Sequence, residues 1–205
     1  MAIPGTVRYS TGMPVPAQGS PSAAAGVPWA TLDADGKRLR LLEAAEAVFA
    51  RDGLDAPVPS IAAAAGAGVG SVYRTFASKD EIVCALAIER LHWVRERARE
   101  ALYEPDAWAG LEGLLRVIAD RQIADGVLNE ALAAALERPE LAESLALATA
   151  GVDEVVQRAR ADGALRVDVT TDELRALFSG LRAANVAEPG SGAKLLELVL
   201  AGLRA

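Results

Sequence analysis

The stretch Ile61–Phe76, with the sequence IAAAAGAGVGSVYRTF, decides the fold. Its first half places small and apolar side chains on one face of a short helix: Ile61, Ala62 and Ala65. Gly66 follows at once, where a tight turn needs a positive φ. The second half repeats apolar side chains with the spacing of another helix: Val69, Val72, Tyr73 and Phe76. Two short helices joined by a glycine-containing turn of about 3–4 residues are typical of a helix-turn-helix.

Small residues and cations surround the second of these helices, the one that a helix-turn-helix inserts into the major groove of DNA. Three small residues let the backbone come close to DNA: Gly68, Gly70 and Ser71. Arg74 can contact a guanine edge or a phosphate. Lys79 lies in the first turn of the next predicted helix, beside the capping Ser78, where free N–H groups and an ammonium group together bind phosphate.

The glycines of this stretch allow a second interpretation, a loop that cradles the phosphates of a nucleotide. The spacing Gly66-x-Gly68-x-Gly70 differs from Gly-x-Gly-x-x-Gly, and no lysine follows as in a P-loop. An alanine-rich helix precedes the glycines where a nucleotide-binding loop has a strand. The sequence therefore favours DNA binding over nucleotide binding.

From Asp35 onward the chain is rich in Ala, Leu, Arg and Glu, which are good helix formers. The apolar spacing predicts no strand, and it predicts helices over 36–52, 58–65, 69–75, 79–103, 107–124, 127–137, 139–161, 171–186 and 192–204. Residues 1–34 are rich in proline and almost free of charge, so we predict a flexible tail there. The sequence therefore predicts an all-α fold that follows a tail.

The composition narrows the classes of function. The chain has 205 residues, a formal charge of −7 and 4% aromatic residues, too few for a β-sandwich or barrel. A single cysteine, Cys84, and a single histidine, His92, exclude a disulfide framework and a Cys/His zinc site within one chain. No apolar run is long enough to cross a membrane and no signal-peptide pattern is present, so we expect a cytoplasmic protein without membrane contact.

The charge is unevenly distributed along the chain. Residues 37–79 hold six basic and four acidic side chains, whereas residues 82–205 hold 14 basic and 20 acidic ones. Because salt screens each charge beyond about 10 Å, a locally positive end can bind a polyanion although the whole chain is acidic.

Three motifs follow one another over residues 38–86. They read Arg40-Leu41-Leu42-x-Ala44-Ala45-x-x-x-Phe49-x-x-x-Gly53, then Ile61-Ala62-x-x-Ala65-Gly66, then Gly70-Ser71-Val72-Tyr73-x-x-Phe76-x-Ser78-Lys79-x-x-Ile82. In this order and spacing they resemble the TetR family of transcriptional repressors. The layout from Trp108 to Leu203 is similar to the ligand-binding and dimerisation domain of that family.

The resemblance implies an all-α homodimer that a small ligand releases from DNA. It implies an N-terminal three-helix helix-turn-helix DNA-binding domain over 35–80 and a helical-bundle ligand-binding and dimerisation domain over 81–205. By position, it implies contacts with base edges from Gly68, Val69, Gly70, Ser71 and Arg74. It implies contacts with DNA phosphates from Tyr73, Thr75 and Lys79.

A polar side chain interrupts the apolar stripe of the helix predicted over 107–124, which runs from Trp108 to Ile118 and continues to Gln122. Burying an unpaired polar group costs about 1–3 kcal/mol, so Gln122 either pairs inside the bundle or faces a ligand cavity. Trp93 and Asn129 could line the same space. We therefore predict an effector pocket lined by Trp93, Trp108, Gln122 and Asn129.

The last two predicted helices, 171–186 and 192–204, favour an interface between two copies of the chain. The final helix is apolar around most of its circumference, so it must be buried on several sides. A second copy would bury it in a four-helix contact with two-fold symmetry.

Two other classes of function compete with DNA binding. An enzyme needs an activated nucleophile, a general base or a metal, and the sequence has no Gly-x-Ser-x-Gly, no His-Glu-x-x-His and no cluster of carboxylates. We therefore expect no catalysis and no cofactor. A helical protein-interaction module without DNA binding is the alternative, and salt-dependent binding to duplex DNA would distinguish it. The sequence favours a ligand-responsive repressor that binds double-stranded DNA at a palindromic operator as a homodimer, with a small molecule as its effector.

Overall fold

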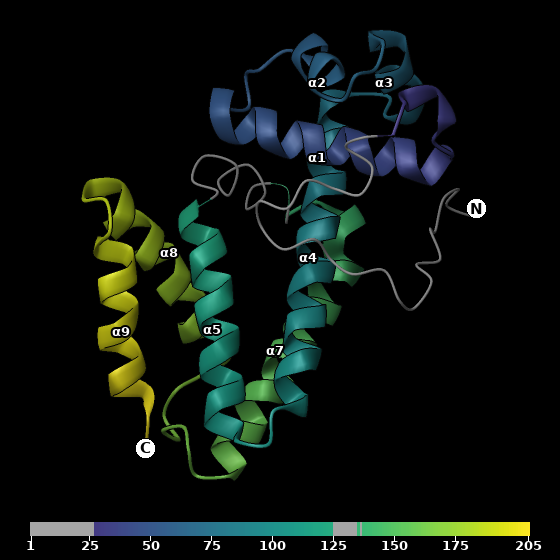
Figure 1. Ribbon diagram of the computed structural model, residues 1–205. Coiled ribbons are helices and arrows are strands. Elements are labelled where there is room, and N and C mark those ends of the chain that lie inside the picture. Colours follow the sequence, from purple (N-terminus) through teal and green to yellow (C-terminus); the bar gives the residue numbers. More distant parts are fainter. Residues whose placement is uncertain (1–26, 125–134, 136) are drawn as a thin grey trace.

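The computed structural model describes residues 27–124, 135 and 137–205, and regular structure within these residues is helical (Figure 1). Outside the helices, one isolated bridge joins Leu165 to Arg204 in the described part of the chain. The predicted all-α fold is therefore confirmed.

Three helices and a short 3-10 turn form an N-terminal unit, the head (residues 27–78), at the top of Figure 1: η1 (Trp29–Thr31), α1 (Ala34–Asp52), α2 (Val58–Ala64) and α3 (Val69–Thr75). Helix α1 begins after Asp33, whose carboxylate accepts a hydrogen bond from the Gly36 amide at 2.8 Å. It ends at Gly53, where φ is 78°, a conformation that favours glycine. The largest fully buried side chains in the core of the head are Leu41, Val48, Phe49, Ile61 and Phe76, together with Ile82 and Leu141 from later in the chain.

Helix α4 (Lys79–Tyr103) belongs to two hydrophobic cores. Its first turns supply Ile82 and Leu86 to the core of the head, and its later turns supply Ala98 to the second core. The helix starts at Ser78, whose hydroxyl accepts a hydrogen bond from the Glu81 amide at 3.1 Å. The core of the head therefore extends past residue 80, because one continuous helix connects the two units.

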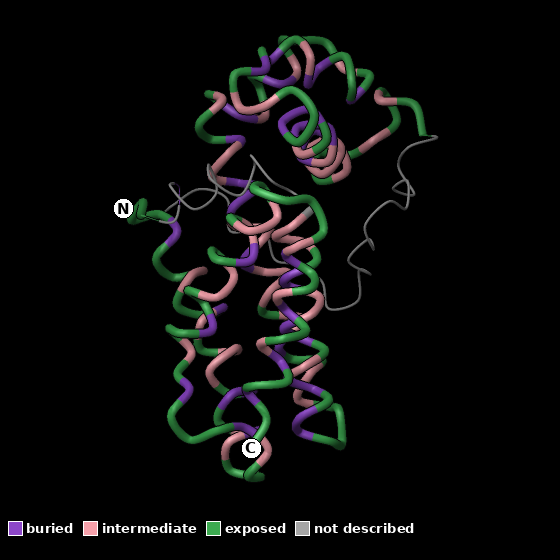
Figure 2. The backbone as a smooth tube through the Cα atoms, turned by 90° about the vertical axis from the view of Figure 1, so that its left-hand side faces the viewer, coloured by how far each residue is buried: buried purple, intermediate pink, exposed green. Residues whose placement is uncertain are grey.

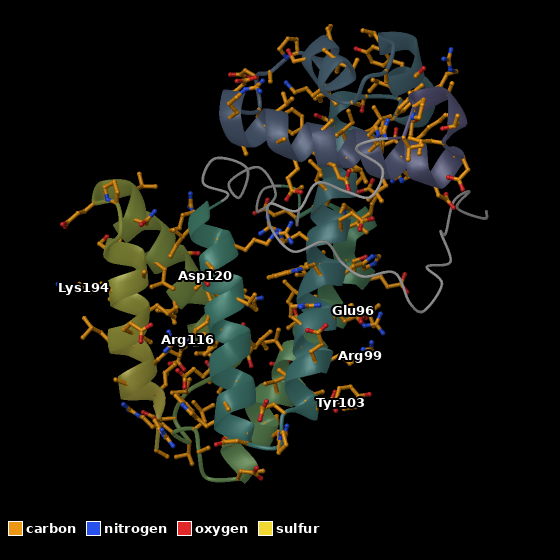
Figure 3. The ribbon with its side chains drawn as sticks, viewed as in Figure 1. Glu96, Arg99, Tyr103, Arg116, Asp120 and Lys194 are labelled. Carbon is orange, nitrogen blue, oxygen red and sulfur yellow. The ribbon has the colours of Figure 1, made fainter. Side chains whose placement is uncertain are left out.

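The second unit, the body, consists of α4, α5 (Ala107–Ala124), η2 (Pro139–Leu141), α7 (Ala142–Ala161), α8 (Thr171–Ala187) and α9 (Ser191–Leu203). Helix α4 packs against α5 and α7, while the hairpin of α8 and α9 packs against α5. Arg116 of α5, labelled in Figure 3, donates a hydrogen bond to Glu197 of α9 at 3.0 Å, which ties this hairpin to α5. Buried positions follow the inner faces of these helices (Figure 2).

The predicted helices agree closely with those of the structure. Helix α1 begins at Ala34 rather than at residue 36, and the helix predicted over 139–161 begins as the 3-10 turn η2 before α7. The helix predicted over 127–137 lies outside the described residues except for positions 135 and 137.

The predicted tail covers residues 1–34, of which 1–26 lie outside the described residues. Its last part forms regular structure, because Trp29 lies in η1 and packs against the core of the head. Burial of the indole removes apolar surface from water and stabilises this turn.

Two glycines of α5 offer a matched test of the packing between α4 and α5. A Cβ atom at Gly110 would overlap the carbonyl oxygen of Ala101, whereas a Cβ atom at Gly113 would meet nothing within 4 Å. We expect Gly113→Ala to raise the free energy of unfolding by up to about 1 kcal/mol, because alanine favours a helix. We expect Gly110→Ala to lower it by about 1–3 kcal/mol, because the backbone must shift.

Urea denaturation at one fixed protein concentration would measure both glycine variants. Equal stability of the two variants would contradict the close approach of α4 and α5 at this point.

Candidate nucleic-acid interface

Helices α2 and α3 are joined by a tight turn with the hydrogen bonds of a Schellman motif. The Ala67 amide donates to the Ala62 carbonyl at 2.8 Å, and the Gly66 amide donates to the Ala63 carbonyl at 3.1 Å. Gly66 has a φ of 66°, as the sequence predicts for this turn. Gly68 then adopts an extended conformation and starts α3. The predicted helix-turn-helix is therefore present in the structure.

Helix α3 has an inner and an outer face. Val72 and Phe76 are buried, at 0% and 1% exposure, and fix the inner face to the head. Tyr73, at 52% exposure, and Val69, at 38%, lie on the outer face. Gly68, Gly70 and Arg74 are exposed as well, and Ser71 and Thr75 are half-buried. The structure thus brings together the side chains that the sequence predicts for base contacts.

Hydrogen bonds within α3 hold two of the predicted DNA-binding side chains. The Arg74 guanidinium donates through Nη2 to Ser71 Oγ at 2.9 Å and lies along its own helix. The Thr75 hydroxyl donates to the Ser71 carbonyl at 3.1 Å. Arg74 must therefore release Ser71 before it can reach outward to a base or a phosphate.

Lys79 lies at the junction of the head and α4. Its ammonium nitrogen is 5.7 Å from the centroid of the Phe49 ring, within the range of a cation–π contact. The side chain is half-buried, so the structure places it against the core of the head. The phosphate contact predicted for Lys79 stays a prediction.

A hollow of about 510 Å³ beside α3 contains functional candidates that the sequence analysis missed. It is lined by Trp29, Ala34, Asp35, Lys37, Arg38, Ser71, Arg74 and Thr75. The excess of basic residues over 37–79 was a signal of such a surface, but the charge balance does not show which cations gather beside α3.

The residues predicted for the effector pocket do not form one cluster. Trp108 and Gln122 are 14 positions apart on α5, which corresponds to about 21 Å along the helix axis. Trp108 is buried near the end of the chain, where the guanidinium of Arg204 lies 5.6 Å from its ring. Trp93 lies at the other end of α5, where the guanidinium of Arg121 is 4.7 Å from its ring. Asn129 lies outside the described residues.

Ion pairs connect the body to the head. Arg121 of α5 donates to Glu46 of α1 at 2.8 Å, and Arg90 of α4 lies 3.9 Å from the same carboxylate. Within the body, Arg138 donates to Asp80 in the first turn of α4 at 3.3 Å, and this hydrogen bond raises the pKa of Arg138. Helix α5 is therefore linked electrostatically to the head, in addition to the continuous α4.

The described part of the chain shows no metal site and no membrane span. No group of three or more His, Cys, Asp or Glu side chains gathers there in a way that could hold a metal ion. None of the described helices combines the length and the apolarity needed to span a bilayer.

A helix-turn-helix with an exposed recognition helix, joined to a helical body, defines a two-part DNA-binding regulator. Residues 41–86 match the family model of bacterial regulatory proteins of the tetR family, and residues 106–205 match that of the SbtR-like transcriptional regulator C-terminal domain. The chain belongs to the TetR family of transcriptional regulators, so the predicted family is confirmed and the protein is a ligand-responsive DNA-binding regulator.

Solved structures of the family resemble the chain over most of its length. A TetR transcriptional regulator from Streptomyces coelicolor is 27% identical with a TM-score of 0.66, covering 82% of this chain and 98% of that one. A TetR transcription regulatory protein from Mycobacterium vanbaalenii is 28% identical with a TM-score of 0.61, covering 84% and 98%. The ketosteroid transcriptional regulator KstR2 of Mycobacterium tuberculosis is 27% identical with a TM-score of 0.60, covering 82% and 95%. No curated protein sequence matches the chain.

Proposed function

We propose that the protein represses transcription by binding a palindromic operator as a homodimer, with α3 of each protomer in the major groove. The observation that carries this proposal is the outer face of α3, where Tyr73 and Arg74 are exposed while Val72 and Phe76 anchor the opposite side. A small-molecule effector in the body lowers the affinity for DNA. In this proposal, the predicted domain over 35–80 binds DNA, and the predicted domain over 81–205 binds the effector and forms the dimer.

Each predicted contact follows from the chemistry of a side chain on α3. Arg74, released from Ser71, donates to a guanine edge or to a phosphate. Val69 offers a methyl group to a thymine methyl. Gly68 and Gly70 leave the backbone free to approach the floor of the groove. The Tyr73 hydroxyl donates to a phosphate, which positions the helix without reading sequence.

Substitutions on α3 test this assignment. We expect Arg74→Ala to weaken operator binding by about 5- to 150-fold and to relax specificity at one base pair, because a bidentate base contact is worth about 1–3 kcal/mol. Tyr73→Phe removes only a hydroxyl and should weaken binding to all sequences similarly. Site selection from random duplex DNA followed by gel-shift titration would measure both effects.

Arg99→Ala is the control for the α3 variants, because Arg99 is exposed on α4 in the body (Figure 3). Unchanged operator affinity in both α3 variants would remove α3 as the reading element. Failure of the unaltered protein to bind duplex DNA in a salt-dependent way would favour the protein-interaction module instead.

The exposed faces of α8 and α9 support dimerisation through these helices, as the sequence predicts. A stripe of small residues runs along the outside of α8: Ala176, Gly180, Ala183 and Ala187. A Cβ atom at Gly180 would meet nothing within 4 Å in the protomer, although glycine inside a helix costs about 1 kcal/mol relative to alanine. On α9, Leu198 is 66% exposed. A second copy packed closely on this face would account for both features.

A substitution that introduces one charge on α9 tests whether the dimer forms through this helix. We expect Leu198→Glu to shift the protein to a monomer, because the dimer would bury an unpaired carboxylate at its centre. Sedimentation at micromolar concentration measures the change. Val167→Glu is the control, because Val167 is 83% exposed in the segment between α7 and α8. A dimer that survives Leu198→Glu unchanged would place the interface elsewhere.

The ion pair of Glu46 and Arg121 supports a route from effector to DNA. Arg121 contacts the Glu46 carboxylate in the head and stacks on Trp93 in the body. An effector that binds beside Trp93 and Gln122 would displace Arg121 and change the orientation of the head. Effector and DNA then weaken each other by the same coupling free energy, commonly about 1–3 kcal/mol.

A double-mutant cycle tests this route without an effector. We expect Glu46→Gln and Arg121→Gln each to reduce operator affinity about fivefold. The double variant should reduce operator affinity no more than either single variant does. This result corresponds to a coupling free energy of about 1 kcal/mol between the two side chains. Arg116→Gln is the control, because Arg116 lies on the same helix but pairs with Glu112 and Glu197 within the body. Additive losses, or an equal loss in Arg116→Gln, would contradict the route.

A further inference from the structure

We infer that the hollow beside α3 binds the sugar–phosphate backbone of the operator, outside the base pairs that α3 reads. This inference rests on the proposed function, because it places the duplex over α3. It adds a second contact per protomer, made by the start of α1 and the turn before it.

The position of the hollow makes it continuous with the DNA-binding face. One wall is α3, which contributes Ser71, Arg74 and Thr75. The other wall is η1 and the first turns of α1, which lie beside α3 in Figure 1. This second wall precedes residue 41, where the match to the family model begins. The contact is therefore a feature of this chain beyond the segment that the model covers.

The charge of the hollow selects an anion. Three cations line it, Lys37, Arg38 and Arg74, against one carboxylate, Asp35. None of the three cations forms an ion pair among the described residues. Arg38 lies 4.5 Å from the centroid of the Phe76 ring, and Arg74 bonds to the Ser71 hydroxyl. By contrast, Arg51 at the far end of α1 is paired with Asp52 at 2.6 Å.

The remaining lining residues fit a sugar–phosphate chain. Ser71 and Thr75 carry hydroxyls, and Trp29 carries an indole N–H donor. Hydroxyls, cations and N–H groups are the usual partners of DNA phosphates, and the apolar ring of Trp29 can cover a deoxyribose. Pockets for small molecules are lined mostly by apolar side chains. Here six of the eight lining residues are polar or charged, and three of these six are cations, which fits the backbone of DNA.

Salt-dependent binding of the full-length protein to its selected operator duplex tests the inference. We expect Lys37→Ala to make the plot of log affinity against log salt less steep by about 2 per dimer, or about 1 per protomer, because each lost phosphate contact releases one counterion fewer. Lys37→Arg should restore the slope. Trp29→Ala should weaken binding, and Trp29→Phe, which keeps the ring without its N–H, should weaken it less.

Arg51→Ala is the matched control. It removes one positive charge from the same helix, 14 positions and about 21 Å along α1 from Lys37. We expect it to leave the slope unchanged. Hydroxyl-radical footprints should show sugars outside the α3 half-site that are protected by the unaltered protein and exposed with Lys37→Ala, while the inner protections persist.

Each outcome separates the two proposals. One outcome is that Arg74→Ala weakens operator binding while Lys37→Ala gives the same salt dependence and the same footprint as the control Arg51→Ala. In that case the inferred backbone contact is wrong and the proposed function stands. If Lys37→Ala changes only the binding of a free nucleotide, the hollow is a small-ligand site and the inference is also wrong. If the unaltered protein binds no duplex, the proposed function itself fails.

Discussion

The packing of Val72 and Phe76 into the head is the constraint on which the DNA-binding surface depends. Helix α3 has only seven residues, too few to be stable alone in water. Val72 of the helix and Phe76, the residue that ends it, join a core that contains Phe49 and Ile61, and this contact fixes both the position and the rotation of the helix. The outer face is exposed because the inner face is held. The reading surface is thus a consequence of hydrophobic burial on the opposite side.

The core that holds α3 also holds the start of α4, the helix that leads into the body. Ile82 and Leu86 of α4 lie in it, so the helix that leaves the head is packed into the same core as α3. The body contacts this unit again through Leu141 of η2, which is buried in the same core, and through the ion pair of Glu46 and Arg121, residues that are 75 positions apart in the chain. A helical rod and a charged contact therefore meet the head at different points. Such an arrangement favours rotation of the head as one piece over internal rearrangement.

Local periodicity was sufficient to predict the helices and the outer face of α3, because Val72 and Phe76 have the spacing of a buried stripe. The predicted helix over 107–124 also places Trp108 and Gln122 about 21 Å apart, because they are 14 helical positions apart. The prediction of one effector pocket grouped them nevertheless. Contacts between distant segments could not be predicted in this way. The ion pair of Glu46 with Arg121 and the place of Trp29 beside α3 depend on how the helices cross, which no local pattern encodes.

The length of α4 makes it a lever. With 25 residues it extends about 37 Å, and it is anchored at one end in the head and at the other in the body. A rotation of about 5° about one end displaces the other by about 3 Å, which is close to the rise of about 3.4 Å between successive base pairs. A small molecule that tilts α4 by about 5° would therefore move the head by nearly the distance between two base pairs.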